Sequence, residues 1–577
     1  MMSGLVMKMT PEKKLAGLLV PLFALRSEHD LGVGDTESLR ELIDWAAREG
    51  FGMVQVLPVN ETGGDSSPYN ILSSVALEPT TLATYPGVLK DLSAADYQKI
   101  CAAHDVAALR SGPVCYAGVR SLKMELLEAA WKKFKKGDLK EKTRRAREFA
   151  VWQEANKDWL EPYTLFRALW RLHAGNENTG DWPKAQRNYD TARRWLAAAT
   201  PLVRRKVRGW RDFFTYVQWV AYGQWSRLKE YGDERGVALV GDVPVGVSLF
   251  SADVFAQPEI FDLTRSSGAP PEKVFAADAF TAKWGQNWGF PLYDWEAMAR
   301  DDYAWWRRRL RKSMEVFHAL RVDHALGFFR IYSFPWRPER NDEFLSLGED
   351  EARERAGGKL PGFVPGDDSS EESCGTNRAQ GERLFRMILE ETGAHRIIAE
   401  DLGELSPYVR PVLRDLEIPG CKIPQWEKGD DGWPVPGRDY ERLSLATYAT
   451  HDHPALRAYW DGWLADTQTG DEQRVGMALR QMQELTRFAE MNVHLPVPWS
   501  DEIHEGLLRG LFASNSWLAV VMVTDLFGTD ERFNVPGAVG GHNWTQRFPV
   551  PVSEWNKRWP EKLSRVATML RETGRAV

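Results

Sequence analysis

The sequence of 577 residues has few cysteines and no long apolar run. Its four cysteines show no C-x-x-C spacing and are too few to cross-link a chain of this length, which excludes a disulfide-rich scaffold and predicts reduced thiols. No segment approaches the roughly 20 consecutive apolar residues that a membrane-spanning helix needs. An apolar run begins at Leu15 after several lysines, as in a signal peptide, but Pro21 and Arg26 interrupt it and no cleavage site follows. The sequence therefore predicts a soluble, cytoplasmic protein.

A strong charge of one sign is also missing. The formal net charge is −7, and basic residues are spread along the chain. Nucleic acids and anionic membranes are normally bound by a concentrated basic surface, so neither is expected as a partner. Hydrophobic residues make up 43% of the sequence and charged residues 27%, which is typical of a soluble globular protein.

Short apolar segments typical of strands alternate with helical patterns. The sequence opens with a strand expected at 17–22, a helix whose apolar residues recur between Leu39 and Ala46, and a second strand expected at 53–57. A β-α-β opening of this kind is typical of a parallel sheet. Six further strands are expected at 237–243, 316–322, 396–399, 421–426, 445–450 and 517–524. The eight strands of a closed barrel are thus accounted for, and we predict an α/β fold, a (β/α)₈ TIM barrel.

Two long segments interrupt this alternation. Residues 91–235 are rich in Lys, Arg, Glu, Ala, Leu and Trp and predict a mainly helical insertion subdomain between strands 2 and 3. An independent helical domain is the alternative, although no Gly-, Ser- or Pro-rich linker marks the edges of the segment. Residues 342–385, which include a stretch rich in Gly, Pro, Ser and acids, predict a loop insertion near the active site. We therefore expect a single catalytic unit over residues 1–577.

Three of the predicted strands end on a carboxylate. Asp323, Glu400 and Asp452 each lie at or just beyond the end of an apolar, strand-like run. Because the carboxyl ends of barrel strands surround the active site, these side chains are expected to converge. No cysteine or phosphate-binding loop accompanies them, so the pattern favours glycoside chemistry, in which one carboxylate is the nucleophile and a second carboxyl group donates a proton.

The neighbours of two of these acids indicate different ionisation states. Arg321 lies on the same strand face as Asp323, and a guanidinium there favours the ionised carboxylate that a nucleophile needs. Glu400 stands between an apolar strand and Asp401, an environment that raises the pKa of a carboxyl group and suits a general acid. Structural roles are the alternatives: an Arg321–Asp323 pair that braces the barrel, and a capping or loop role for Glu400.

Aromatic and histidine residues complete the candidate site. The sequence has 25 tryptophans, most of which we expect in the core, but sugar rings stack on indole, and Trp284 and Trp288 lie in a glycine-containing loop suited to that role. His451 and His453 are also compatible with a metal site. No third ligand lies near them in the sequence, so no metal and no cofactor is predicted, and Asp452 is better explained as a carboxylate that holds sugar hydroxyl groups.

Nine short motifs together carry a specific resemblance. They lie at residues 31–35, 67–70, 241–244, 251–254, 285–293, 321–324, 399–403, 450–452 and 532–537. In this order they resemble the motifs of the 4-α-glucanotransferases of the amylomaltase (disproportionating enzyme) family, a glycoside hydrolase family 77-like group, over essentially the whole chain. The resemblance implies that Asp323 is the nucleophile, Glu400 the acid/base and Asp452 the transition-state stabiliser. It also implies sugar contacts at the matching positions Tyr69, Asp242, Trp288, Arg321, His324 and His451.

The resemblance implies an activity as well. It is the transfer of glucosyl or maltooligosyl units between α-1,4-glucans with retention, acting on maltose, maltooligosaccharides and glycogen or starch-like glucans. One motif departs from the family, because residues 325–327 read Ala-Leu-Gly where the family has Phe-Arg-Gly. This variant resembles the branch containing the plant cytosolic disproportionating enzyme, which uses maltose as donor and a branched glucan as acceptor. The alternatives are a retaining α-amylase-like hydrolase and a catalytically silent glycan-binding or regulatory protein.

Overall fold

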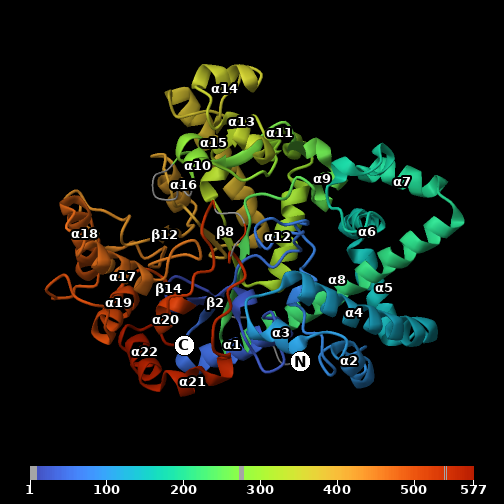
Figure 1. Ribbon diagram of the computed structural model, residues 1–577, viewed down its shortest axis with the longest axis horizontal. Coiled ribbons are helices and arrows are strands. Elements are labelled where there is room, and N and C mark those ends of the chain that lie inside the picture. Colours follow the sequence, from blue (N-terminus) through green and yellow to red (C-terminus); the bar gives the residue numbers. More distant parts are fainter. Residues whose placement is uncertain (1–8, 272–277, 538–539, 541) are drawn as a thin grey trace.

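At the centre of the computed structural model, eight parallel strands close into a barrel (Figure 1). The structure describes residues 9–271, 278–537, 540 and 542–577. The strands follow one another around the barrel in sequence order, and the last strand pairs with the first. They are β1 (Leu15–Leu19), β2 (Met53–Gln55), β3 (Ala238–Val243), β8 (Ala319–Val322), β11 (Ile397–Ala399), β12 (Gly420–Lys422), β13 (Ser444–Ala446) and β14 (Leu518–Met522). Each overlaps a predicted strand, and the predicted TIM barrel is confirmed.

The strand β12 is shorter than expected. It ends at Lys422, whereas the apolar pattern predicts a strand over 421–426. Pro424 lies two residues beyond and has no N–H to donate to a strand ladder. The chain instead turns, and the N–H of Trp426 donates to the carbonyl oxygen of Ile423 at 2.9 Å. The shorter strand leaves Trp426 in the loop that follows β12, on the side of the barrel where strands end.

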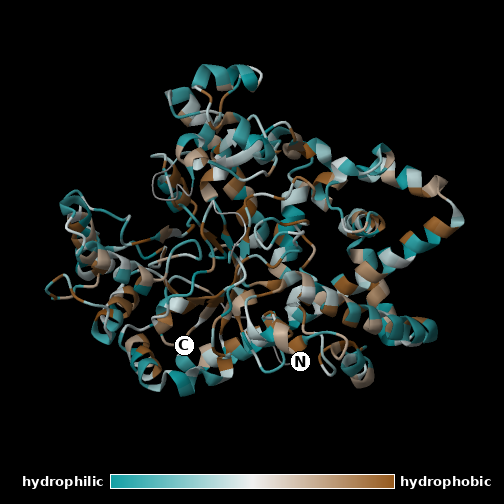
Figure 2. Ribbon diagram, in the orientation of Figure 1, coloured by the Kyte–Doolittle hydropathy of each residue, from teal (hydrophilic) through white to brown (hydrophobic). Residues whose placement is uncertain are grey.

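The barrel strands are buried on both faces. Every residue of β1, β3, β8 and β14 is buried, as expected for parallel strands covered by helices. Gly241 shows how closely the layers approach, because a Cβ there would lie 2.3 Å from Cδ2 of Phe317. Figure 2 shows hydrophobic residues on the central strands and a hydrophilic outer helix, α14 (Glu349–Arg355), at the top of the view. Within the described ranges, no helix is long and apolar enough to cross a membrane.

A group of helices lies between β2 and β3 in the chain and extends to the right in Figure 1. Aromatic side chains pack these helices together; for example, the ring of Phe134 lies 5.3 Å from that of Trp219 and 5.6 Å from that of Phe149. The helices are α2 (Ala94–Cys101), α3 (Val106–Ser111), α4 (Tyr116–Phe134), α5 (Arg144–Ala155), α6 (Lys157–Leu172), α7 (Tyr189–Ala198) and α8 (Pro201–Arg235).

A small antiparallel sheet is built from loops that follow the barrel strands. Its order is β10-β9-β5-β6, with β5 (Ser266–Ala269) and β6 (Gln286–Asn287) from the segment after β3, β9 (Ile331–Phe334) from the segment after β8, and β10 (Gly362–Val364). Residues 342–385 are thus more ordered than the expected loop, because they contain α14, β10 and much of α15 (Glu371–Thr392). The apolar side chains of Leu384 and Phe385 are fully buried, which fixes α15 against the rest of the fold.

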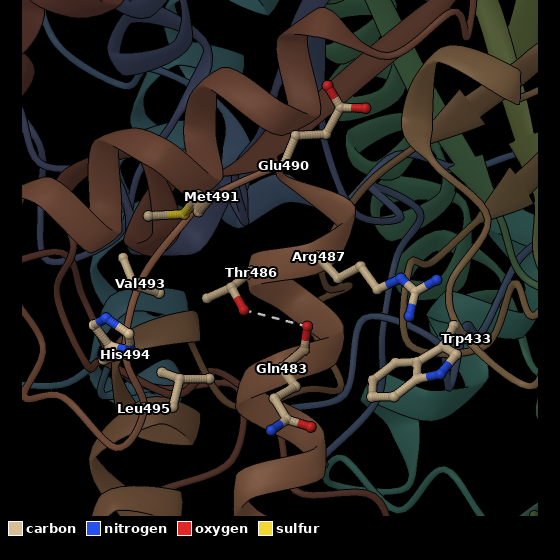
Figure 3. A pocket seen from close by; sticks show the side chains of 9 residues that line it. All are labelled: Trp433, Gln483, Thr486, Arg487, Glu490, Met491, Val493, His494 and Leu495. Carbon is tan, nitrogen blue, oxygen red and sulfur yellow. Dashed lines mark hydrogen bonds between the residues drawn. The ribbon is translucent and has the colours of Figure 1, made fainter.

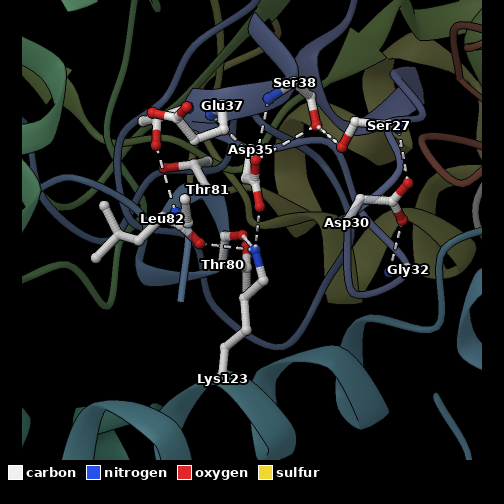
Figure 4. Close-up of polar contacts among 12 residues, drawn as sticks. Ser27, Asp30, Gly32, Asp35, Glu37, Ser38, Thr80, Thr81, Leu82 and Lys123 are labelled. Carbon is white, nitrogen blue, oxygen red and sulfur yellow. Dashed lines mark hydrogen bonds and ion pairs between the residues drawn. The ribbon is translucent and has the colours of Figure 1, made fainter. Parts of the chain in front are cut away.

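Lys123 of α4 joins the helical group to the barrel helices (Figure 4). Its ammonium group is fully buried, donates to the carbonyl oxygens of Thr80 and Leu82 at 2.8 Å each, and lies 3.4 Å from Asp35 Oδ2. Asp35 also caps α1 (Thr36–Glu49) by accepting hydrogen bonds from two backbone N–H groups. Burial lowers the pKa of Lys123, and the Asp35 carboxylate opposes that effect. One cation therefore satisfies three buried oxygen atoms.

We predict that Lys123→Met lowers the free energy of unfolding by about 3–5 kcal/mol, because it removes the cation beside the buried Asp35 carboxylate and the donor to two carbonyl groups. Urea denaturation measures the change. Lys132→Met, at an exposed position of the same helix, is the matched control and should have almost no effect. Equal free energies of unfolding for the two variants would show that Lys123 does not stabilise the contact between the helical group and the barrel helices.

Candidate active site

The predicted acids lie at the same end of the barrel. Asp323 directly follows β8, Glu400 directly follows β11, and Asp452 lies in the turn after β13. Arg321 and Asp242 lie within β8 and β3, where the strand register pairs them. The barrel thus brings together residues that are far apart in the sequence.

The guanidinium group of Arg321 is the centre of the site. Its Nη1 lies 2.6 Å from Asp242 Oδ2 and 3.1 Å from Asp323 Oδ1, and its Nη2 lies 2.8 Å from Glu400 Oε1. Arg321 is 3% exposed. Burial opposes its charge, but the Asp242 and Glu400 carboxylates outweigh burial and hold the pKa of Arg321 above its usual value. One permanent cation therefore contacts three carboxyl groups from neighbouring strands.

Glu400 is held in a surrounding that favours its protonated form. Burial, assisted by the negative charges of Asp323 and Asp242, raises the pKa of Glu400 to about 8, although Arg321 opposes this shift. Its Oε2 accepts a hydrogen bond of 2.7 Å from the backbone N–H of His324. His324 has a φ of +45°, in the left-handed region that few residues with a side chain adopt. This turn aims the N–H of His324 at Glu400.

Asp452 is held as an ionised carboxylate by its neighbours. Burial opposes ionisation, but the charge of His451 and a hydrogen bond from Asn534 outweigh it and lower the pKa of Asp452. The Asn534 amide donates to Asp452 Oδ1 at 2.7 Å, and Arg532 Nη2 donates to the Asp452 carbonyl oxygen at 3.2 Å. Both contacts come from the loop that follows β14, so this loop positions the turn that carries Asp452.

The helix that follows this turn is held from α20 (Val523–Phe527), a short helix directly after β14. Asp525 Oδ1 accepts a 2.8 Å hydrogen bond from the N–H of Leu456, the first residue of α17 (Leu456–Asp466). The sequence analysis assigned no role to Arg532, Asn534 or Asp525. Arg532 and Asn534 belong to a recognised motif, and Asp525 follows the eighth strand, but neither signal shows which residue they contact.

Most of the expected sugar-contacting residues form a continuous chain of contacts around the acids. The hydroxyl of Tyr69 donates to Asp242 Oδ2 at 2.8 Å, and the ring of Tyr69 stacks on His451 with centroids 5.1 Å apart. On the other side of Glu400, the ring of Trp288 meets His324 edge to face at 5.0 Å. Tyr69, Asp242, Trp288, His324 and His451 are therefore brought together with Arg321.

Trp284 is the exception, and its expected stacking role is corrected. Its indole is 6% exposed, packs edge to face against Trp336, and donates to the carbonyl oxygen of Phe344 at 3.0 Å. It belongs to a small hydrophobic cluster beneath the antiparallel sheet and offers no free face to a sugar. The glycine-containing loop signalled a binding surface, but only the second of its two tryptophans reaches the site.

An exposed tryptophan that sequence reasoning missed lies beside His453. Trp426 is 41% exposed, and its ring lies 5.3 Å from that of His453, the neighbour of Asp452 in the chain. The predicted strand at 421–426 included Trp426 as its last residue, so the sequence did not indicate an exposed loop position there. Among the described residues, no group of three or more His, Cys, Asp or Glu is arranged to hold a metal ion.

Comparisons with known proteins point to one family. The 4-alpha-glucanotransferase family model matches residues 20–552. The 4-alpha-glucanotransferase of Chlamydia pneumoniae is 31% identical over 553 residues, covering 93% of this chain and 92% of its own length. The 4-alpha-glucanotransferase DPE2 of Oryza sativa subsp. japonica is 35% identical over 332 residues, 56% of this chain and 32% of its own.

A solved structure shows the same fold. An amylomaltase from Streptococcus agalactiae, in complex with acarbose, has a TM-score of 0.74 and 23% sequence identity, covering 98% of this chain and 100% of its own. These relatives do not favour the α-amylase-like hydrolase or the silent glycan-binding protein considered from the sequence. The family match over nearly the whole chain, together with the relative at 31% identity, shows that the chain belongs to the 4-alpha-glucanotransferase family.

Proposed function

We propose that this enzyme transfers glucosyl or maltooligosyl units between α-1,4-glucans by a retaining double displacement. Asp323 is the nucleophile, Glu400 the acid/base, and Asp452 the carboxylate that holds sugar hydroxyl groups in the transition state. One observation supports the proposal above all: the carboxyl groups of Asp323 and Glu400 both contact the buried guanidinium of Arg321. In this arrangement the pKa of Glu400 is raised to about 8, as a proton donor requires. Maltooligosaccharides and glycogen or starch-like glucans are the proposed substrates.

In the first step, an oxygen of Asp323 attacks the anomeric carbon of the donor. The glycosidic bond breaks, and Glu400 gives its proton to the departing oxygen, leaving a β-linked glycosyl ester on Asp323. In the second step, Glu400 takes the proton from the 4-hydroxyl of an acceptor, which attacks the same carbon and displaces Asp323. The α-1,4 bond forms again and Glu400 regains its proton.

The surrounding residues support binding of a glucan chain. We assign Trp288 and the exposed Trp426 to stacking on sugar faces, since indole rings offer a broad apolar surface beside a polar edge. Arg321, Asp242 and Tyr69 form a connected hydrogen-bond network that orients the nucleophile. For the chain as a whole we propose one catalytic unit, in which 91–235 form a helical subdomain and 342–385 border the site.

Leu326 is the proposed determinant of donor choice. It is 9% exposed and lies against the loop that follows Glu400, because a Cβ on Gly403 would be 3.8 Å from Leu326 Cδ1. A short apolar side chain here removes the five hydrogen-bond donors that an arginine would offer. We propose that this apolar floor favours maltose as donor, as the sequence resemblance implies.

The donor proposal is tested by comparing kcat/KM for maltose and for maltotriose as donors, with saturating glycogen as acceptor. We expect the wild-type enzyme to use maltose efficiently. Leu326→Arg should shift the ratio toward maltotriose, whereas the volume-conserving control Leu326→Met should not. A wild-type enzyme that prefers maltotriose strongly and leaves maltose almost unused would overturn the proposal.

For the roles of the acids, we expect Glu400→Gln to lower kcat on maltotriose by about 10²- to 10⁴-fold, because the proton donor is lost. With an α-glucosyl fluoride, whose leaving group needs little protonation, the same variant should still release fluoride. Asp323→Asn should be inactive on both donors, since an amide is a poor nucleophile. Normal turnover of maltotriose by Glu400→Gln would refute the assignment.

For the pH dependence, kcat/KM on maltotriose should fall as the pH rises through about 8. The direction follows from the role of Glu400, because the raised pKa keeps the required proton below that value and the proton is lost above it. The fluoride donor is the control and should show a weaker alkaline fall. An alkaline fall of equal size with both donors would contradict a proton-donating role.

A further inference from the structure

A surface pocket of about 510 Å³ lies against α18 (Glu472–Phe488), a helix at the edge of the molecule in Figure 1. Its lining residues include none of the candidate active-site residues. Figure 3 shows side chains entering it from α18, from the segment after this helix, and from Trp433. The mechanism proposed above makes no use of this pocket.

One wall of the pocket is polar. Gln483 and Arg487 are spaced four residues apart and lie on one side of α18, and Glu490 lies in the turn just after the helix. Glu490 forms an ion pair with Arg438, and Arg487 lies 3.3 Å from Asp431. These side chains supply hydrogen-bond donors and acceptors in a fixed row, without an excess of either charge.

The facing wall is apolar. Met491, Val493 and Leu495 alternate along a segment without helix or strand structure and line the pocket. Trp433 lies at one end, and its indole is braced by Arg480, whose guanidinium carbon is 3.3 Å from the ring centroid. Arg480 also donates to the carbonyl oxygen of Gly432, which fixes the segment that carries the indole.

This combination of walls fits a neutral sugar chain. A glucose ring has apolar C–H faces and a rim of hydroxyl groups, and vicinal hydroxyl groups accept from guanidinium and donate to carboxylate groups in charge-assisted hydrogen bonds. Among the described residues of the polar wall, a phosphorylated ligand would find no unpaired cation, because Arg487 is paired with Asp431 and the Glu490 carboxylate lies in the same wall. A purely apolar ligand would leave the polar row without partners.

The pocket is linked to the barrel mouth by a short hairpin. Residues 427–435 fold back on themselves, with hydrogen bonds from Val435 N–H to Glu427 O at 2.9 Å and from Gly429 N–H to Trp433 O at 2.8 Å. This hairpin directly follows Trp426, the exposed indole beside His453. One segment after β12 thus presents an indole at the mouth and a second indole at the pocket.

We propose that this pocket is a second glucan-binding site, which holds a run of α-1,4-linked glucose units of a polymeric acceptor such as glycogen while a chain end occupies the active site. The substrate class rests on the proposed function. Binding at two points raises the local concentration of chain ends near the acids, an advantage that a polymer has and a trisaccharide lacks.

Affinity electrophoresis in native gels that contain glycogen tests the proposal without turnover. Full-length Asp323→Asn protein is used, so that the glycogen in the gel is not turned over. In this Asp323→Asn background, a second substitution, Trp433→Ala or Gln483→Arg, should raise the dissociation constant for glycogen, obtained from the retardation, about tenfold. A change of this size corresponds to the loss of one aromatic or polar contact. Gln483→Arg fills the pocket from an exposed helical position and keeps the test valid if Trp433→Ala fails to fold. Gln473→Arg, an exposed change outside the pocket on the same helix, is the matched control and should leave retardation unchanged.

Kinetics in the otherwise wild-type enzyme separate this site from the active site. The two pocket variants should raise the KM for glycogen as acceptor while leaving kcat/KM for maltotriose alone unchanged. Undiminished retardation of both variants would overturn the proposal, as would a parallel loss of maltotriose turnover. Failure of the acid assignments would leave the retardation result intact, so the two proposals fail independently.

Discussion

The ion pairs of the buried Arg321 guanidinium are the interaction on which the rest of the site depends. Three carboxyl groups contact this single cation, so the cluster would carry an excess of negative charge if all of them were ionised. Excess charge in a buried position costs several kcal/mol, and retaining a proton relieves that cost. Burial together with these charges raises the pKa of both Asp242 and Glu400. An acid that holds a proton near neutral pH is therefore a consequence of burial, reinforced by the excess of carboxyl groups over the single cation Arg321.

The barrel makes this cluster possible because its register is fixed. Asp242 is the direct neighbour of Arg321 across β3 and β8, and Ile398, two residues before Glu400, is its neighbour across β8 and β11. Asp452, the third proposed catalytic acid, is held differently, because it lies in a turn rather than at a strand end. Arg532 and Asn534, from the segment after β14, secure that turn, and Asp525 of the same segment holds the start of α17. The strand frame and this segment therefore divide the positioning of the acids.

Much of this architecture could be predicted from the sequence, because strand ends and carboxylates coincide in it. The eight apolar runs, and the positions of Asp323 and Glu400 directly after them, depend on local pattern and on the general geometry of barrels. Element bounds were less predictable: β12 stops before Pro424, and residues 342–385 contain helices and a strand, β10, that pairs with β9. Local pattern carries no information on such pairing.

The remaining differences have the same origin. Trp284 and Trp288 share one loop, and only their tertiary surroundings separate a buried indole from one beside His324. Asn534 reaches Asp452 across 82 positions of sequence, a contact that no spacing rule reveals. The different roles of the acids likewise came from family resemblance, because the sequence shows three carboxylates but not how each is surrounded.

The central claim is that Asp323 becomes covalently glycosylated during transfer. The most direct measurement is mass spectrometry of Glu400→Gln protein that is quenched and digested after incubation with α-glucosyl fluoride in the absence of acceptor. The account predicts a single hexosyl group on the peptide that contains Asp323, removed when an acceptor sugar is added before quenching. Fluoride release without any adduct, or an adduct on a different carboxylate, would contradict it.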